Sequence, residues 1–405
     1  MTLDLRTRVD RDVTPIDVRE FFEVELPRLA ADRSDLAVPG ALELDVAPIS
    51  VEFTEGTWTL SITGDSVRVV PGDAGQASVR LDQAELTDIV HDQRTPMTLL
   101  TAGELDMARG GLGDVLDWWV VLRSLIDARP VHTAGAIDFK DRDGAELDLQ
   151  RAFNADDDAA EASHFLAEAG FLHLTNVFTE QEMAEVSSDM DAAFEHYAPD
   201  DGRSWWATTA SGEQRPVRLQ WFHERSAITS DLLQDDRLLR IATLTSDGHR
   251  HRSDANQIEA LVKPIGVVQG ISDLPWHKDC SLGRHSYRCC SLTVGISITG
   301  ADERSGQLAV VAGSHRALVQ PAFFRSSWGL PEVPLPTAVG DVTVHCSCTL
   351  HKSHPPVDRE RRVMYTDFTL PSPAEDGTDK RGAAEIARVR ERAHKVVSQA
   401  PGYVG

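Results

Sequence analysis

The last third of the sequence is dominated by short β-type stretches separated by turn residues, which restricts the fold more than any other feature. Gly, Pro and Asp punctuate five such stretches, at 259–270, 291–300, 307–315, 341–346 and 362–370. Many short strands broken in this way are typical of a jelly roll or double-stranded β-helix. Helices should flank this framework, because Thr179 and Glu182 form a capping box that predicts a helix start.

The first 130 residues follow a different pattern. Thr14-Pro15 is a helix-start signal, and the period then changes to two over residues 49–70. Turn signals at 55–56 and 64–65 divide that stretch into three strands, and residues 77–82 predict a fourth. An apolar helix is expected over 113–126. This half is therefore predicted to be an α+β domain, an antiparallel sheet with helices.

A chain of 405 residues suits two or three domains. An acidic, alanine-rich run begins at residue 151, and regular periodicity restarts after it. We place the linker near 151–160 and predict two domains, residues 1–150 and 151–405.

Composition excludes several classes of partner. The net charge of −24 (40 basic against 64 acidic residues) repels phosphate backbones and anionic headgroups, so nucleic acid and membrane partners are not expected. The sequence contains neither a signal-peptide pattern at its start nor an apolar run long enough to span a bilayer. Its five cysteines form no regular framework, which predicts reduced thiols and a cytoplasmic location. The oligomeric state is left open.

The stretch PWHKDC (275–280) places His277 and Asp279 two positions apart, which on a strand turns both side chains to one face. A third ligand from a distant strand would complete a 2-His-1-carboxylate face with open positions for iron. His351, near the end of the strand that begins at Gly340-Asp341, is the candidate.

Residues 163–370 resemble the phytanoyl-CoA dioxygenase family of Fe(II)/2-oxoglutarate oxygenases. The motifs that carry the resemblance are AGFLHLTNVFTEQE, PWHKD, SGQLAVVAGSH and the GD…LHKSHPP…RR segment. The resemblance implies that His277, Asp279 and His351 bind Fe(II). It also implies that Arg362, eleven residues after the distal histidine, and Ser353 contact 2-oxoglutarate.

The resemblance implies a cytoplasmic 2-oxoglutarate-dependent dioxygenase that uses O2 to hydroxylate a C–H bond of a small molecule. Asp279 stands where related halogenases lose the carboxylate, which favours hydroxylation. Lys278 and Pro356 depart from the residues usual in the family. The main alternative is a lipid-binding or carrier protein whose oxygenase fold has lost turnover, and desaturation or halogenation is a third.

Other residues compete for roles in the site. His345 becomes a ligand if the strand register differs, and Arg361 competes with Arg362 for the cosubstrate. Lys263, on the strand before His277, is a candidate contact for 2-oxoglutarate, with a surface lysine as the alternative. The stretch 200–228 combines four aromatic residues with three arginines. It fits either a lid that holds an acidic lipid or ordinary packing and surface pairing.

Residues 15–130 resemble the sterol carrier protein type 2 fold, through SVRLDQAELTDIV and GELDMARGGLGDVL. In that family the sheet and helices enclose a tunnel for acyl chains or sterols, so the resemblance implies a lipid-like, apolar or acyl-type substrate. Trp118 and Trp119 would line such a tunnel, or would equally form an ordinary core.

Overall fold

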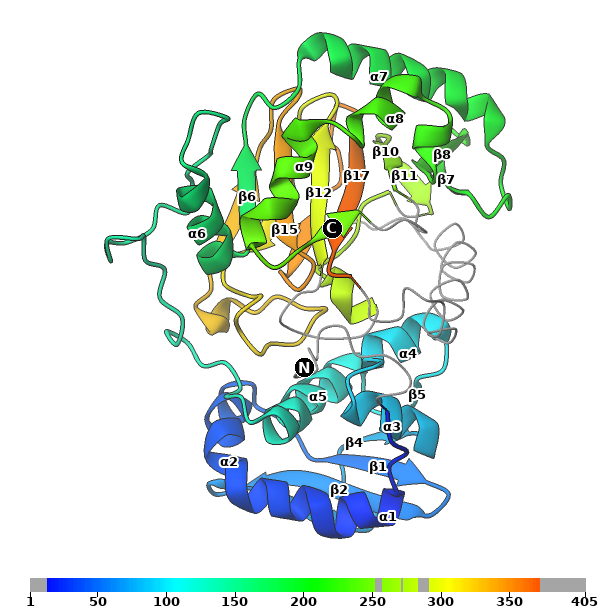
Figure 1. The fold of residues 1–405 in the computed structure, drawn as a ribbon. Helices are drawn as coiled ribbons and strands as arrows, with labels where there is room; N and C mark the ends of the chain where they lie inside the picture. The colour runs from blue at the N-terminus through cyan, green and yellow to red at the C-terminus, as the bar shows by residue number, and fades with distance from the viewer. Residues whose placement is uncertain (1–12, 252–256, 271, 283–290, 372–405) are drawn as a thin grey trace.

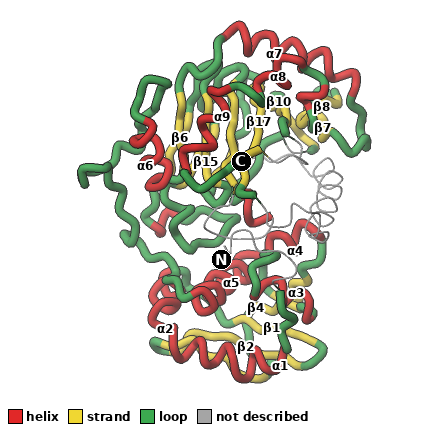
Figure 2. Tube along the Cα trace, viewed as in Figure 1, coloured by secondary structure: helices red, strands yellow, loops and turns green. Residues whose placement is uncertain are grey.

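The computed structural model describes residues 13–251, 257–270, 272–282 and 291–371, and shows two sets of elements (Figure 1). The N-terminal elements occupy the lower part of the view, and the strand-rich elements occupy the upper part (Figure 2). Of the five cysteines, Cys289 and Cys290 lie outside the described residues. Among the described helices, none combines the length and apolar character needed to cross a bilayer.

A helical segment opens the N-terminal part. Its consecutive pieces are α1 (Val18–Glu20), η3 (Phe21–Glu25) and α2 (Leu26–Glu43). The predicted cap at Thr14 was wrong: Asp17 is the N-cap, and its side chain accepts a hydrogen bond from the Glu20 amide at 2.8 Å. The carboxylate serves as well as the threonine hydroxyl in this role.

A five-stranded sheet of order β3-β2-β1-β4-β5 packs against these helices. Its strands are β1 (Ile49–Phe53), β2 (Gly56–Thr63), β3 (Ser66–Pro71), β4 (Ala77–Arg80) and β5 (Asp106–Arg109). Strands β1 and β4 pair in parallel, which the predicted antiparallel sheet did not include. The helices that follow are α3 (Gln83–Val90), α4 (Pro96–Ala102) and α5 (Leu112–Asp127). Trp118 and Trp119 on α5 are each 3% exposed and lie in this core. The packing therefore favours an ordinary core role for the two tryptophans over the lining of a tunnel.

The second set of elements centres on a nine-stranded sheet. Its main path is β11-β7-β8-β10-β17-β12-β15-β6, with β9 paired to β17, and these neighbouring strands pair antiparallel. The bounds are β6 (Phe171–Leu174), β7 (Ser204–Thr209), β8 (Gln214–Leu219), β9 (Arg250–His251), β10 (Glu259–Lys263), β11 (Val267–Gln269), β12 (Ser291–Ser297), β15 (Val342–Cys346) and β17 (Arg361–Thr369).

A smaller antiparallel sheet has the order β14-β13-β16. Its strands are β13 (Leu308–Val311), β14 (Glu332–Leu335) and β16 (His351–Ser353), and the short helical turns nearby are η7 (Asp279–Leu282) and η8 (Ser326–Trp328). Two antiparallel sheets are thus present where strands were expected. The full jelly-roll topology and the domain limits at 150 and 151 stay predictions.

Helices pack against the large sheet and share its core. They are α6 (Ala159–Ala169), α7 (Glu180–Ala193), α8 (Ala227–Leu232) and α9 (Asp236–Ala242), with the turns η4 (Phe194–His196), η5 (Phe222–Glu224) and η6 (Thr243–Thr245). The predicted capping box is confirmed, because Thr179 and Glu182 cap α7 reciprocally. Phe153, inside the predicted linker, is instead buried in the large core, at 1% exposure.

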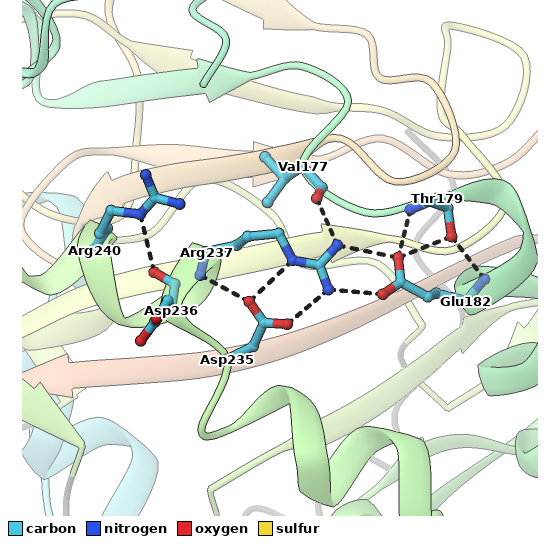
Figure 3. Close-up of polar contacts among 7 residues, drawn as sticks. All are labelled: Val177, Thr179, Glu182, Asp235, Asp236, Arg237 and Arg240. Atoms are coloured by element: carbon cyan, nitrogen blue, oxygen red, sulfur yellow. Dashed lines mark hydrogen bonds and ion pairs between the residues drawn. The ribbon is translucent and has the colours of Figure 1, made fainter. Parts of the chain in front are cut away.

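One ion-pair network joins two of these helices (Figure 3). Arg237 on α9 donates to both carboxylate oxygens of Glu182, at 2.7 and 3.2 Å, and also to Asp235 and to the Val177 carbonyl. Hydrogen bonds from Arg237, above all other causes, lower the pKa of Glu182 to about 2. One guanidinium therefore fastens the N-terminus of α7 to α9.

The two sets of elements also contact each other. Asp117 on α5 forms an ion pair with Arg325 at 2.5 Å, and the His132 imidazole lies 2.9 Å from the Trp328 carbonyl. Leu318 joins the N-terminal core. The segment between β13 and β14 is therefore the surface on which the N-terminal elements rest.

The Glu182 ion pair predicts a pH-dependent stability. Because its folded-state pKa is lowered, ionised Glu182 contributes stability at pH values above its unfolded pKa, near 4.5, and this contribution is lost as the pH falls toward 2. E182Q should lower the free energy of unfolding at pH 7 by about 1–2 kcal/mol, since the pair is partly exposed. Thermal unfolding at pH 7 and pH 3 should show the gap to wild type narrowing in acid.

E185Q is the matched control, because Glu185 lies on the same helix, is exposed, and pairs only with Gln181 among the contacts described. An E182Q deficit that stays constant from pH 7 to pH 3 would contradict the assignment.

Candidate metal centre

The centre is built on a two-residue β-bridge between distant parts of the chain. His277 donates its backbone N–H to the His351 carbonyl at 2.9 Å, and the His351 N–H donates back at 3.0 Å. This antiparallel pairing places the two imidazole rings next to each other, tilted by 51°, with 4.2 Å between their centroids. Because His351 also opens β16, the small sheet fixes the position of both rings.

Asp279 completes a three-residue cluster. Its Oδ1 atom lies 3.3 Å from His277 Nε2 and 3.7 Å from His351 Nε2. The three donor atoms all lie within 4.8 Å of one another, so a single ion could touch all of them. The structure therefore brings together the three residues that the sequence motifs selected.

The hydrogen bonds of the two histidines leave the correct nitrogen for a metal. His277 Nδ1 lies 2.7 Å from the Pro275 carbonyl, and His351 Nδ1 lies 2.9 Å from the Thr349 carbonyl. A carbonyl only accepts, so each Nδ1 carries the proton and each Nε2 presents a lone pair toward Asp279. Two oriented imidazoles and one carboxylate fit a divalent metal with open coordination positions.

The charge states of the cluster are also those of ligands. Burial lowers the pKa of His351 well below its usual value, and repulsion from His277 and His345 lowers it further, so this imidazole is neutral. Burial disfavours ionisation of Asp279, yet the neighbouring imidazoles, His351 first, bring its pKa well below the usual range. A neutral imidazole and an ionised carboxylate are the forms that bind metal.

Lys278, between the two ligands, points the other way. Its side chain is completely buried, and Nζ donates to the Ser314 carbonyl at 2.9 Å. His277 lies on the β-bridge and Asp279 begins the helical turn η7, so Lys278 lies at the junction between the two. Lys278, which departs from the residue usual in the family, therefore anchors the metal-site segment.

A second cluster lies next to β16 and is cationic. Lys263 is 1% exposed and donates to the Ser353 hydroxyl at 2.6 Å, so the surface-lysine alternative was wrong. Arg361 is its register partner on β17 and is 3% exposed. Arg361 donates to the Gly306 carbonyl at 2.9 Å, whereas its Nε atom has no partner among the described residues. Two buried cations with an unused donor suit an anionic ligand.

Arg362 lies away from the metal cluster. It forms an ion pair with Asp191 at 2.8 Å and donates to Ser187 at 3.0 Å, so it faces α7 on the far side of the sheet. Arg361, one position earlier, faces Ser353 instead. Strand alternation gives these adjacent residues opposite faces, so the structure brings Arg361 rather than Arg362 to Ser353 and Lys263. The cosubstrate contact of Arg362 stays a prediction.

A row of three paired residues crosses the large sheet beside Asp279. Thr293 on β12 is opposite His345 on one side and Asp367 on the other, which puts their side chains on one face. Thr293 donates to Asp279 Oδ2 at 3.0 Å. Burial raises the pKa of Asp367 to about 7, with repulsion from Asp279 and Glu259 adding to the effect, although the residue is solvent-accessible. Sequence reasoning missed Asp367.

The aromatic and basic residues of 200–228 divide between two environments. Arg218 lies over the Trp205 ring at 4.5 Å and pairs with Glu259, next to the row just described. Trp206 and Phe222, by contrast, pack into the large core. Only part of this group is therefore available to a ligand.

The chain is similar to several solved structures and, over part of its length, to one protein family. No curated protein sequence matches the chain. Among solved structures, AviO1 from Streptomyces viridochromogenes Tue57 is 22% identical, over 53% of this chain and 96% of that one, with a TM-score of 0.42. The epimerase SnoN of nogalamycin biosynthesis, described as non-heme and α-ketoglutarate-dependent, is 18% identical over 54% and 88%, also with a TM-score of 0.42. EctD from S. alaskensis is 17% identical over 59% and 83%, with the same TM-score.

The family model described as phytanoyl-CoA dioxygenase (PhyH) matches residues 166–363. That range contains all three residues of the metal cluster and both residues of the buried cation pair. Over this range the chain is similar to the phytanoyl-CoA dioxygenase family.

Proposed function

We propose that this chain is a phytanoyl-CoA dioxygenase family member that uses Fe(II), 2-oxoglutarate and O2 to hydroxylate a C–H bond of a small molecule. The observation that carries the proposal is the face formed by His277 Nε2, His351 Nε2 and Asp279 Oδ1, with both Nδ1 atoms held by carbonyls. Iron bound there would couple conversion of 2-oxoglutarate and O2 into succinate and CO2 to insertion of the second oxygen atom into the substrate. Three protein ligands leave three positions for those reactants.

The cationic cluster supplies the second half of the cosubstrate site. Ser353 lies two residues after His351 on β16, a distance of roughly 6–7 Å along a strand. This spacing is comparable to the length of a five-carbon diacid that chelates the metal with one end. The far carboxylate would then meet the Ser353 hydroxyl, the Lys263 ammonium and the Arg361 guanidinium, which is shaped for a carboxylate.

The substrate side of the site is more polar than an acyl chain requires. Asp367 and Glu259 share this face, and Arg218 with Trp205 lies beside them. A small substrate that carries hydrogen-bonding groups fits these side chains better than a purely apolar one.

The N-terminal domain also contacts the segment that carries the metal cluster. Its helix α4 contacts η7, the turn that begins at Asp279. We infer that this domain forms part of the wall beside the metal, whether or not it also binds a ligand of the sterol carrier type.

The competing function is a carrier protein with an inactive oxygenase fold. It is less well supported, because a fold that had lost turnover would have no need to keep both histidine tautomers, the carboxylate and the buried cations in place. Desaturation uses the same residues, and the mass of the product would distinguish it from hydroxylation.

His277→Ala should abolish turnover. Wild-type protein supplied with Fe(II), 2-oxoglutarate and O2 should release succinate, and H277A should release it at least about 100-fold more slowly, since one of three ligands is missing. His196→Ala is the matched control, because His196 is exposed on η4, outside the metal cluster. Equal slow release by wild type and H277A would favour the carrier hypothesis.

The two adjacent arginines should behave differently. R361A should raise the 2-oxoglutarate concentration for half-maximal succinate release by about 10- to 100-fold, since charge-assisted hydrogen bonds are lost. R362A should leave that concentration within about twofold and instead lower the thermal midpoint, because it frees α7. A larger 2-oxoglutarate effect for R362A than for R361A would restore the original sequence assignment.

A further inference from the structure

His345 is a buried imidazole without the hydrogen bonds that a structural histidine would have. It is 1% exposed on β15, and within the described part of the chain neither ring nitrogen has a hydrogen-bond partner. Buried polar groups nearly always have a hydrogen-bond partner, so the unpaired imidazole indicates that its hydrogen bond forms only when the site is loaded. Its ring is tilted by 49° against that of His351, with 4.2 Å between the ring centroids, which places it at the edge of the metal cluster.

The nitrogen of His345 faces a different oxygen from the one that the two ligand histidines face. Its Nε2 lies 3.5 Å from Asp279 Oδ2, whereas Nε2 of His277 and of His351 lies nearest Oδ1. Thr293 already donates to Oδ2 at 3.0 Å. A distance of 3.5 Å is just beyond a well-formed hydrogen bond, and such contacts often tighten when a site is loaded.

We propose that His345 is a positioning residue that holds Asp279 in a one-oxygen binding mode. Nε2–H of His345 and the Thr293 hydroxyl together engage Oδ2, so that only Oδ1 is free for the metal. A carboxylate that chelated through both oxygens would occupy one of the three positions that 2-oxoglutarate and O2 need. His345 would thus protect the open positions without binding the metal itself. This inference rests on the proposed metal centre.

The test compares His345→Phe, His345→Gln and Thr293→Val by titration of the metal-free proteins with Co²⁺ alone, using calorimetry and visible absorption. H345F should bind Co²⁺ about 10- to 100-fold more weakly, as is typical for loss of a group that orients a ligand. H345Q, whose amide can donate to Oδ2, should recover most of the affinity with an unchanged Co²⁺ spectrum. T293V should weaken binding in the same direction.

Stability of the metal-free protein separates positioning from packing. Phenylalanine keeps the ring and removes two unpaired nitrogens, so metal-free H345F should unfold at the same temperature as wild type or higher. A lower midpoint for metal-free H345F together with unchanged Co²⁺ affinity would show a packing role and overturn the proposal. A changed Co²⁺ spectrum in H345Q would overturn it differently, by showing that His345 is itself a ligand. Failure of wild type to bind Co²⁺ would instead reject the metal centre.

Discussion

The reciprocal pair of backbone hydrogen bonds between His277 and His351 is the contact on which the candidate site depends. These bonds join a segment outside the regular strands to the first residue of β16, and every other feature of the centre follows from that register. Asp279, at the start of η7, then lies toward the two imidazoles, and the Lys278 side chain donates to Ser314 instead. Because these bonds are backbone bonds, many side-chain substitutions nearby would leave the geometry of the ligands intact.

Lys278 links that register to the rest of the molecule. The Ser314 carbonyl accepts its ammonium, and the Ser314 hydroxyl accepts the Leu350 N–H, one residue before the distal histidine. A little further along the same segment, Leu318 enters the N-terminal core and Trp328 contacts His132. The metal-site segment and the N-terminal elements are thus both attached to one stretch of chain between β13 and β14.

The sequence predicted that His277, Asp279 and His351 come together, because the motifs that contain them are local and selected all three. Their binding of a metal stays a prediction. The arginine that faces Ser353 was harder to predict. Its face depends on where β17 begins opposite Lys263, and this is set by the length and shape of the loop containing Pro355 and Pro356, which the count of residues does not reveal. Asp367 was missed because only sheet register places it beside Thr293.

Charge is distributed unevenly along β17, and this asymmetry gives the proposed site a direction. Arg361 at the start of the strand and Asp367 near its end point to the same face, about 20 Å apart for six strand residues. A dianionic cosubstrate entering between them is drawn toward Arg361 and Lys263 and repelled by Asp367 and Asp279, so its far carboxylate has one favourable orientation. The opposite orientation would bring two acids together beside the metal. In the proposed site, the end near Asp367 is thereby left for the substrate.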